Sequence, residues 1–252
     1  MASEVKTNKI SPATGTAFTF GDSGDTFTIP SGATLTNSGT ATGFTAGLLG
    51  LVKYTGNGTY TVGGTSNGTA GDEGNASVTK VIIEVQGGGA GGSYHAGTSF
   101  IGGSAGGYAK KFIDVAAMKA AGQTATITVG AGGAGATGTG AGVNGGDSKW
   151  ESPTGAITLT VTGVKGVSAY SSYGTATGGA ATNGDVNIKG GDGGAYSMRA
   201  GGDSMFGHGG WNGWTGEVAP GAGAGYGSGG GGGYNVTAGA GAGGIVLIWE
   251  YA

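Results

Sequence analysis

The chain has 252 residues, a net charge of −3 and a hydrophobic content of 37%. This balance excludes the basic surface that phosphate neutralisation requires, so we expect no nucleic-acid partner. The absence of cysteine excludes disulfides and thiolate metal sites and is compatible with assembly in a reducing cytoplasm.

Glycine dominates the composition. The 66 glycines are about a quarter of the chain, whereas ordinary proteins contain ~7% glycine. Each ordered glycine loses more backbone entropy on folding than any other residue. Such a chain folds only where glycine supplies something that other residues do not, and the low apolar content predicts a thin core.

The first region of the chain, from Lys9 to about Thr69, is rich in Thr, Ser and Gly and alternates polar with apolar residues. The alternation predicts short strands near 16–20, 26–30 and 33–36, joined by turns. One apolar stripe runs through them, made of Phe18, Phe20, Phe27, Ile29 and Leu35. Because this stripe is too small to bury itself within one chain, we expect a homotrimeric β-stalk.

A turn-rich connector at 56–77 ends this region. We therefore expect two domains: residues 1–77, an N-terminal β module that oligomerises, and residues 78–252, a glycine-rich distal domain.

The second region begins and ends with apolar runs. Residues 79–86 and 245–251 are nearly continuous in apolar character, which predicts strands buried on both faces. Three further segments alternate and predict strands with one solvated face: 107–114, 123–129 and 157–162. Together they indicate a modest β-sandwich. Residues 114–122 predict one short helix with Asp114 at its N-cap and Gly122 at its end.

The apolar runs are also too short for a membrane helix of about 20 residues. The chain starts MASEVKTNKI, without the apolar core of a signal peptide. We expect no membrane insertion, and release from the cell by lysis or with a particle.

Glycine-rich tracts follow or precede the predicted strands. They lie at 87–92, 130–142, 221–233 and 239–244. Disordered linkers are disfavoured because the tracts alternate with strands that must pair, and collagen is excluded because the Gly-x-y period is not sustained. Two readings remain open: polyproline-II-like glycine helices bonded to neighbouring tracts, and silk-like strands. We favour the glycine helices, within an all-β fold.

Catalytic and cofactor motifs occur only without their structural context. Residues 130–135 match GxGxxG but cannot open a helix, and residues 64–68 match GxSxG without a strand-to-helix turn. His95 and His208 have no metal-ligand spacing. Acidic residues are scattered, which disfavours a polysaccharide depolymerase. We expect no enzyme activity, no cofactor and no metal.

A short motif occurs twice, as GGDSKW at 145–150 and GGDSMF at 201–206. We expect Asp147 and Asp203 to bond turn amides, and Trp150 and Phe206 to anchor strands.

Aromatic residues and histidines cluster between the glycine tracts. Rigid rings on loops gain contact area at low entropic cost, so these are candidate contact residues, although burial between layers is an equally good reading for any one of them. The candidates are Tyr94, His95, Tyr170, Tyr173, His208, Trp211 and Trp214. Residues 208–214 make the strongest candidate loop.

The order of strands and tracts resembles one known family across roughly residues 78–252. The matching text is VIIEVQGGGAGG, GGSAGGYAKKFIDV, ITVGAGGAGATGTGAGVNGGDSKW, PGAGAGYGSGGGGG and GAGAGGIVLIWEYA. It is similar to glycine-rich bacteriophage tail-fibre and tip proteins of the marine type, and residues 10–44 also resemble an N-terminal module of such fibres. Residues 190–202 and the pair Trp211 and Trp214 depart from the pattern, so it assigns no role to a loop residue.

The resemblance implies a non-enzymatic, trimeric virion component, assembled in the host cytoplasm and acting outside the cell. Its implied partners are copies of itself, other tail or fibre proteins, and a bacterial surface receptor, either a glycan or an outer-membrane protein. The alternative is a purely structural part, such as a capsid fibre or decoration, without a receptor.

Overall fold

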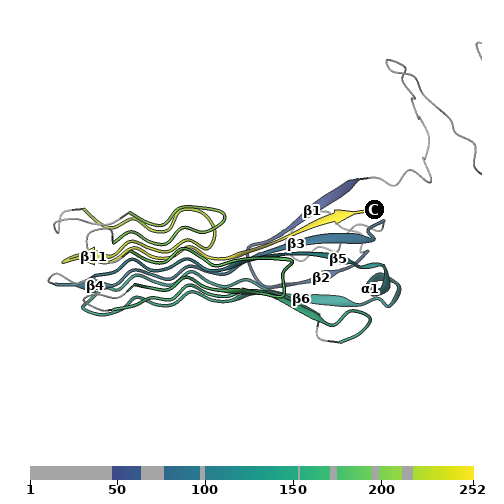
Figure 1. Ribbon diagram of the computed structural model, residues 1–252, viewed down its shortest axis with the longest axis horizontal. Helices are drawn as coiled ribbons and strands as arrows, with labels where there is room; N and C mark the ends of the chain where they lie inside the picture. Colours follow the sequence, from purple (N-terminus) through teal and green to yellow (C-terminus); the bar gives the residue numbers. More distant parts are fainter. Residues whose placement is uncertain are drawn as a thin grey trace, which may run out of the picture. The chain divides into compact units, whose positions relative to one another are not determined.

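The computed structural model describes residues 47–63, 77–96, 100–152, 154–170, 175–194, 199–211 and 218–252. All of them belong to one unit, Thr45–Ala252. Within this unit the longer strands gather at one end, and glycine-rich tracts without strand pairing extend from them to the other end (Figure 1).

The first sheet has five strands in the order β1-β12-β3-β5-β10, and every neighbouring pair is antiparallel. Its strands are β1 (Leu48–Tyr54), β3 (Lys80–Gln86), β5 (Tyr108–Asp114), β10 (Val186–Ile188) and β12 (Ile245–Tyr251). Because β12 lies between β1 and β3, strands from the two ends of the described chain lie side by side, with β1 at one edge of this sheet and β12 next to it.

The second sheet has the order β2-β6-β7-β8-β9, again antiparallel. Its strands are β2 (Gly58–Thr61), β6 (Thr124–Thr128), β7 (Ser148–Ser152), β8 (Leu159–Gly163) and β9 (Ala181–Thr182). The short helix α1 (Ala116–Ala120) connects β5 to β6, and a separate parallel pair joins β4 (Tyr94–His95) to β11 (Gly233–Tyr234).

The hydrophobic core is formed by the inward side chains of both sheets. Trp150, Ile83, Ile127 and Ile248 are among its fully buried members. The core also contains a buried carboxylate, Glu250, whose Oε1 accepts a hydrogen bond of 2.8 Å from the Tyr60 hydroxyl. Burial, and then the Glu250 charge, raise the pKa of Tyr60 far above its ordinary value, so the phenol remains a donor.

The all-β prediction is confirmed, with antiparallel sheets and a single short helix among the described residues. The five strands expected from sequence correspond to β3, β5, β6, β8 and β12. The helix begins later than expected, with Val115 rather than Asp114 at the N-cap, although Asp114 Oδ1 still accepts the Ala116 N–H. Gly122 ends it with a φ of 60°, which favours glycine.

Burial on both faces is wrong for most of β3 and for the end of β12, where Trp249 and Tyr251 are half-buried. In β3, Ile82 and Glu84 are only half-buried, while Val81, Ile83 and Val85 are buried. The strand therefore has one core face and one partly open face, as in most antiparallel sheets.

The domain boundary also differs from the expected position at residue 77. Strands β1 and β2 precede residue 77, yet they pair with β12 and β6 inside the sandwich, and the unit begins at Thr45. Pairing with strands far along the chain places β1 and β2 in the sandwich. The predicted stalk strands at 16–36 lie outside the described residues.

The tract that follows β3 donates its backbone N–H groups to three neighbouring tracts in rotation. Successive residues bond to different neighbours, and every third residue returns to the same one, three positions further back, at N···O distances of 2.9–3.0 Å. The donor and acceptor pairs, in chain order, are Gly87–Gly107, Gly88–Gly146, Gly89–Ala242, Ala90–Ser104, Gly91–Val143 and Gly92–Gly239. This period of three differs from the two-sided ladder of a strand.

The tracts pack so closely that several positions leave no space for a side chain. A Cβ on Gly89 would lie 2.0 Å from the Ser228 carbonyl oxygen, and one on Gly103 would lie 2.1 Å from that of Ala90. Both contacts are with backbone, which has little freedom to move away. The glycine content therefore follows from backbone-to-backbone packing.

Side-chain oxygens bond backbone amides of the tracts. Asp192 Oδ1 accepts the Gly178 N–H at 2.8 Å and pairs with the Lys189 ammonium at 2.6 Å. The Gly178 N–H, followed by Lys189, lowers the pKa of Asp192. A carboxyl whose pKa is lowered by folding adds stability that is complete above its unfolded pKa of about 3.9 and is lost as the pH falls through the lower folded value.

We therefore expect Asp192→Asn to flatten the acid side of the stability profile. Urea unfolding midpoints of the wild type should fall more steeply than those of the variant between about pH 4 and pH 2, because only the wild type takes up this proton on unfolding. Parallel profiles in that window would show that Asp192 does not contribute in this way.

Candidate contact surface at the end of the glycine tracts

The tract ends opposite the sheets carry aromatic side chains on a fixed backbone. Tyr94 and His95 form β4 directly after the first tract, at the end of the molecule where Figure 1 labels β4 and β11. The Tyr94 N–H and carbonyl both bond Gly140, at 3.0 Å each, and Gly233 pairs with Tyr94 in parallel. We call the described residues Tyr94, His95, Phe100, Tyr170, Arg199 and Tyr234 the aromatic end.

His95 and Tyr170 form the more open part of the aromatic end. Their rings stack with centroids 5.6 Å apart and planes inclined by 27°. Tyr170 is 42% exposed and His95 is half-buried. Two sequence-predicted contact residues from distant segments therefore meet, and the ring of Tyr170 remains partly exposed.

Phe100, Tyr234 and Arg199 form the more enclosed part. Phe100 is 1% exposed, its ring centroid lies 5.7 Å from that of Tyr234, and the Arg199 guanidinium lies 3.8 Å above its face. Such a cation over an aromatic ring is attracted by the negative face of the ring. Burial lowers the pKa of Arg199, partly offset by Tyr234.

The remaining predicted contact residues do not all join this surface. Trp211 is 54% exposed and its indole covers the backbone of Gly221. His208 is exposed and its carbonyl accepts the Ala224 N–H. Tyr173 and Trp214 lie outside the described residues, so the expected 208–214 contact loop is described only in part.

Sequence reasoning missed Phe100 and Arg199. Phe100 stands alone between glycine-rich stretches, and Arg199 lies in a segment that departs from the family pattern. The sequence around each residue does not indicate their contact, because the ring and the guanidinium meet only through the packing of distant tracts.

The two copies of the repeated motif have different structures. Asp147 accepts the Lys165 N–H at 2.9 Å and Asp203 accepts the Gly209 N–H at 2.7 Å, so both bond amides beyond their own motif. Trp150 lies in β7, fully buried, as an anchor should.

Phe206 does not lie in a strand, contrary to the prediction. It occupies a turn that the Ser204 N–H closes by bonding the Gly207 carbonyl. Its ring meets that of Tyr108 edge-on at 5.8 Å. The turn forms because the chain reverses between two tracts here, whereas GGDSKW leads into the sandwich.

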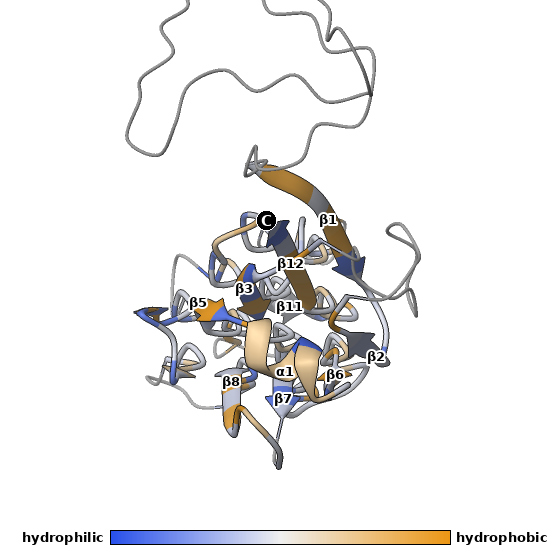
Figure 2. Cartoon of the chain, turned by 90° about the vertical axis from the view of Figure 1, so that its right-hand side faces the viewer, coloured by the Kyte–Doolittle hydropathy of each residue, from blue (hydrophilic) through white to orange (hydrophobic). Residues whose placement is uncertain are grey.

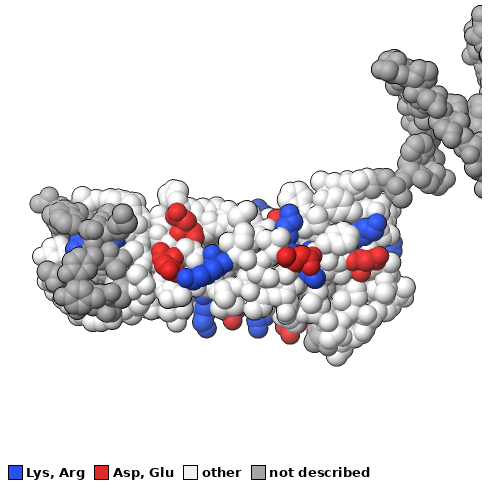
Figure 3. Space-filling model, in the orientation of Figure 1, with Lys and Arg blue, Asp and Glu red and all other residues white. Residues whose placement is uncertain are grey.

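The aromatic end can stack against a ring or an apolar surface, while the Arg199 guanidinium is engaged with the Phe100 ring. Within the described ranges, no group of three or more His, Cys, Asp and Glu side chains is arranged to hold a metal. No helix in the same ranges has the length and apolar character to cross a membrane. Charged side chains on the face drawn in Figure 3 form small groups of mixed sign.

The dinucleotide-like stretch at 130–135 is part of the tract packing. The Gly133 N–H bonds the Gly89 carbonyl, and a Cβ on Gly132 would lie 2.1 Å from the Gly241 carbonyl oxygen. Its backbone is therefore already occupied by neighbouring tracts.

Comparison with known proteins identified no match for this chain, either among family models or among curated sequences.

Proposed function

We propose that this protein is a structural component of a bacteriophage virion, a tail fibre or fibre tip, and that its aromatic end contacts the host surface. The observation that carries the proposal is the polarity of the unit. Strand β1 begins at Leu48, which pairs with Tyr251 near the C-terminus, at the end of the sandwich away from the tracts, whereas the aromatic end lies at the opposite end of the tracts (Figure 1). One end suits attachment and the other suits contact.

Stiff presentation is the role we assign to the glycine tracts. We propose that they are polyglycine-II-like helices, because their hydrogen bonds repeat every three residues and go to neighbouring tracts. At ~3.1 Å per residue, the tract from 87 to 93 separates the sandwich from the aromatic end by roughly 20 Å. A lattice fixed by main-chain bonds orders the rings before a receptor arrives, which reduces the entropic cost of binding.

The remainder of the proposal follows the resemblance stated for the sequence. Residues before the sandwich form a β-stalk that trimerises and joins other tail or fibre proteins. The protein assembles in the host cytoplasm, acts outside the cell and catalyses no reaction. Its receptor is a bacterial glycan or an outer-membrane protein, because ring faces stack equally well on sugars and on apolar side chains.

Binding of the recombinant protein to host cells tests this proposal. The full chain should bind susceptible cells and compete with infection. The double variant His95→Ala with Tyr170→Ala should reduce cell binding at least about tenfold, because both stacked rings are lost and one such contact contributes roughly 1 kcal/mol or more.

Met205→Ala is the matched control, since Met205 is 58% exposed in the turn whose Phe206 packs on Tyr108 of β5. It should bind cells as the wild type does, and all variants should keep the wild-type unfolding midpoint. If the double variant binds and competes normally, the aromatic end is not the contact surface. A particle protein with no cell binding at all would have the purely structural role of a capsid fibre or decoration.

A further inference from the structure

The side of the first sheet that faces away from the core carries a band of exposed apolar side chains. The ladder register places these residues on one face, because Leu51 is opposite Trp249, Ile82 is opposite Phe112, and Val186 is opposite Lys110. Phe112 is 52% exposed, and Leu51, Val186 and Ile188 are each at least 40% exposed. We call this side, from β1 to β10, the outer face; β1 is largely hydrophobic in Figure 2.

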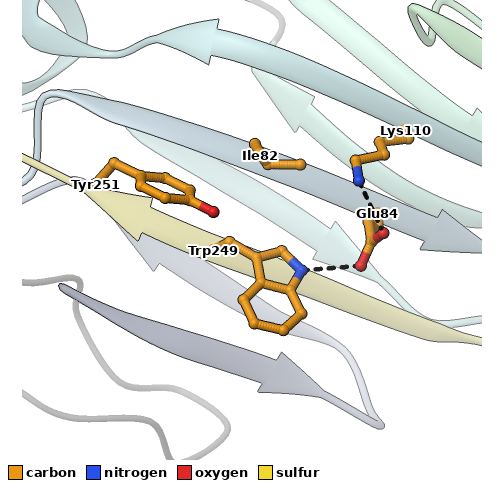
Figure 4. A pocket seen from close by; sticks show the side chains of 5 residues that line it. All are labelled: Ile82, Glu84, Lys110, Trp249 and Tyr251. Atoms are coloured by element: carbon orange, nitrogen blue, oxygen red, sulfur yellow. Dashed lines mark hydrogen bonds and ion pairs between the residues drawn. The ribbon is translucent and has the colours of Figure 1, made fainter. Parts of the chain in front are cut away.

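Two pairs of opposite charges lie on the outer face, and Lys53 of β1, opposite Leu247, adds one exposed positive charge. Glu84 accepts the Trp249 indole N–H at 2.8 Å, and the Lys110 ammonium lies 3.6 Å from the same carboxylate (Figure 4). Glu84 also accepts a hydrogen bond of 2.7 Å from the Tyr108 hydroxyl. Lys80 is opposite Asp114 in the ladder. A partner for this face therefore needs apolar surface more than a compensating net charge.

The outer face has both a protrusion and a hollow. A hollow of about 250 Å³ is lined by Ile82, Trp249 and Tyr251 together with the Glu84 and Lys110 pair. The exposed Phe112 ring belongs to the residue paired with Ile82, so it stands directly beside the hollow. A surface with a protruding ring beside an aromatic-walled hollow is complementary to another copy of itself.

The dimensions of the outer face also favour a second copy. Four strands of seven residues and the three-residue β10, at ~4.8 Å spacing and ~3.3 Å per residue, give a face roughly 24 Å wide and up to about 23 Å long. Its planar area of about 490 Å², before side-chain relief, is more than half of the ~800 Å² that each partner contributes to an ordinary stable interface. A single added strand would cover only about a fifth of that width.

We propose that a second copy of this chain packs on the outer face, with Phe112 of one copy against the hollow beside Trp249 of the other. The contact would pair apolar surfaces that are otherwise hydrated across the whole sheet. This contact on the sandwich is separate from the trimerisation that we propose for the residues before it, and it does not depend on receptor binding.

The test is the association state of the full chain, measured by sedimentation velocity between about 1 and 100 µM. The wild type should associate in this range beyond the trimer that the proposed stalk forms. Phe112→Asp should raise the apparent dissociation constant at least about tenfold, since it places a carboxylate against an apolar wall. Met205→Asp, which alters an equally exposed side chain on the tract part, should leave the association unchanged.

A wild-type chain that stays monomeric, or no larger than that trimer, throughout this range overturns the proposal, including the case in which residues 1–46 of the same chain cover the face. Unchanged association of Phe112→Asp also overturns it. If Phe112→Asp lowers the unfolding midpoint, Ile188→Asp on the edge strand β10 provides the same readout. Cell binding of the same samples is scored separately, so failure of this proposal and failure of receptor recognition are distinguishable.

Discussion

Gly89→Ala is expected to lower the free energy of unfolding by about 3 kcal/mol or more, the upper range for overpacking in a rigid interior. The added methyl carbon would lie 2.0 Å from the Ser228 carbonyl oxygen and 2.8 Å from that of Gly227. The Gly89 N–H bonds Ala242 and its carbonyl accepts the Gly133 N–H. Because the clash is with backbone, relief requires two tracts to separate and strains these bonds as well.

Urea denaturation of the wild type, Gly89→Ala and Gly138→Ala measures this effect. Gly138 is the matched control, because a Cβ there would meet nothing within 4 Å and its φ is not in the left-handed region. Gly138→Ala should change the stability by no more than ~0.5 kcal/mol. Equal stability of the two alanine variants would show that close backbone packing does not hold the tracts together.

Trp150→Ala is expected to cost about 3–5 kcal/mol, the usual range for removing a large aromatic side chain from a core. Trp150 is fully buried and lies on β7, between β6 and β8. Its strand neighbours include Ile127 and Val161, which are also buried. Removal of the indole leaves a cavity that two paired sheets cannot close by a small shift.

Trp211→Ala removes the same side chain from an exposed position and serves as the control. Because Trp211 is half exposed, its loss should cost less than about 1 kcal/mol. Thermal unfolding should therefore place Trp150→Ala well below the wild type and Trp211→Ala close to it. If both tryptophans cost the same, the sandwich is not the stable core of the unit.

The sequence predicted those strands whose own residues show an apolar run or an alternation of polar and apolar side chains. The apolar runs in β3 and β12, and the alternation in β5, β6 and β8, were sufficient to predict these five strands. Strand β7 was not predicted as a whole, since its sequence, SKWES, buries the serines at both of its ends beside Trp150. Ser148 is tolerated inside because its hydroxyl accepts the Gly130 N–H.

Long-range pairing could not be predicted from local pattern. β1 was assigned to the N-terminal module because its place in the sandwich depends on β12, at the far end of the chain. For the same reason, the period-three bonding of the tracts was one of two open readings, since neither Gly89 nor its neighbours indicate that Ala242 is the acceptor.

The sequence indicated several residues of the candidate contact surface, but not which of them contact one another. Tyr94, His95 and Tyr170 were singled out as rings between tracts, but their sequence does not place His95 against Tyr170. Arg199 was missed because its role depends on the ring of Phe100, which comes from another tract.

We propose that the sandwich end of this protein attaches to a phage particle and that the aromatic end points outward. A cryo-EM map of the particle at side-chain resolution tests it most directly. The account predicts density for the two sheets on the particle side and for Tyr94, His95 and Tyr170 at the exposed extremity. Particles that lack the protein, or that carry it with the aromatic end buried against another virion protein, would contradict the account.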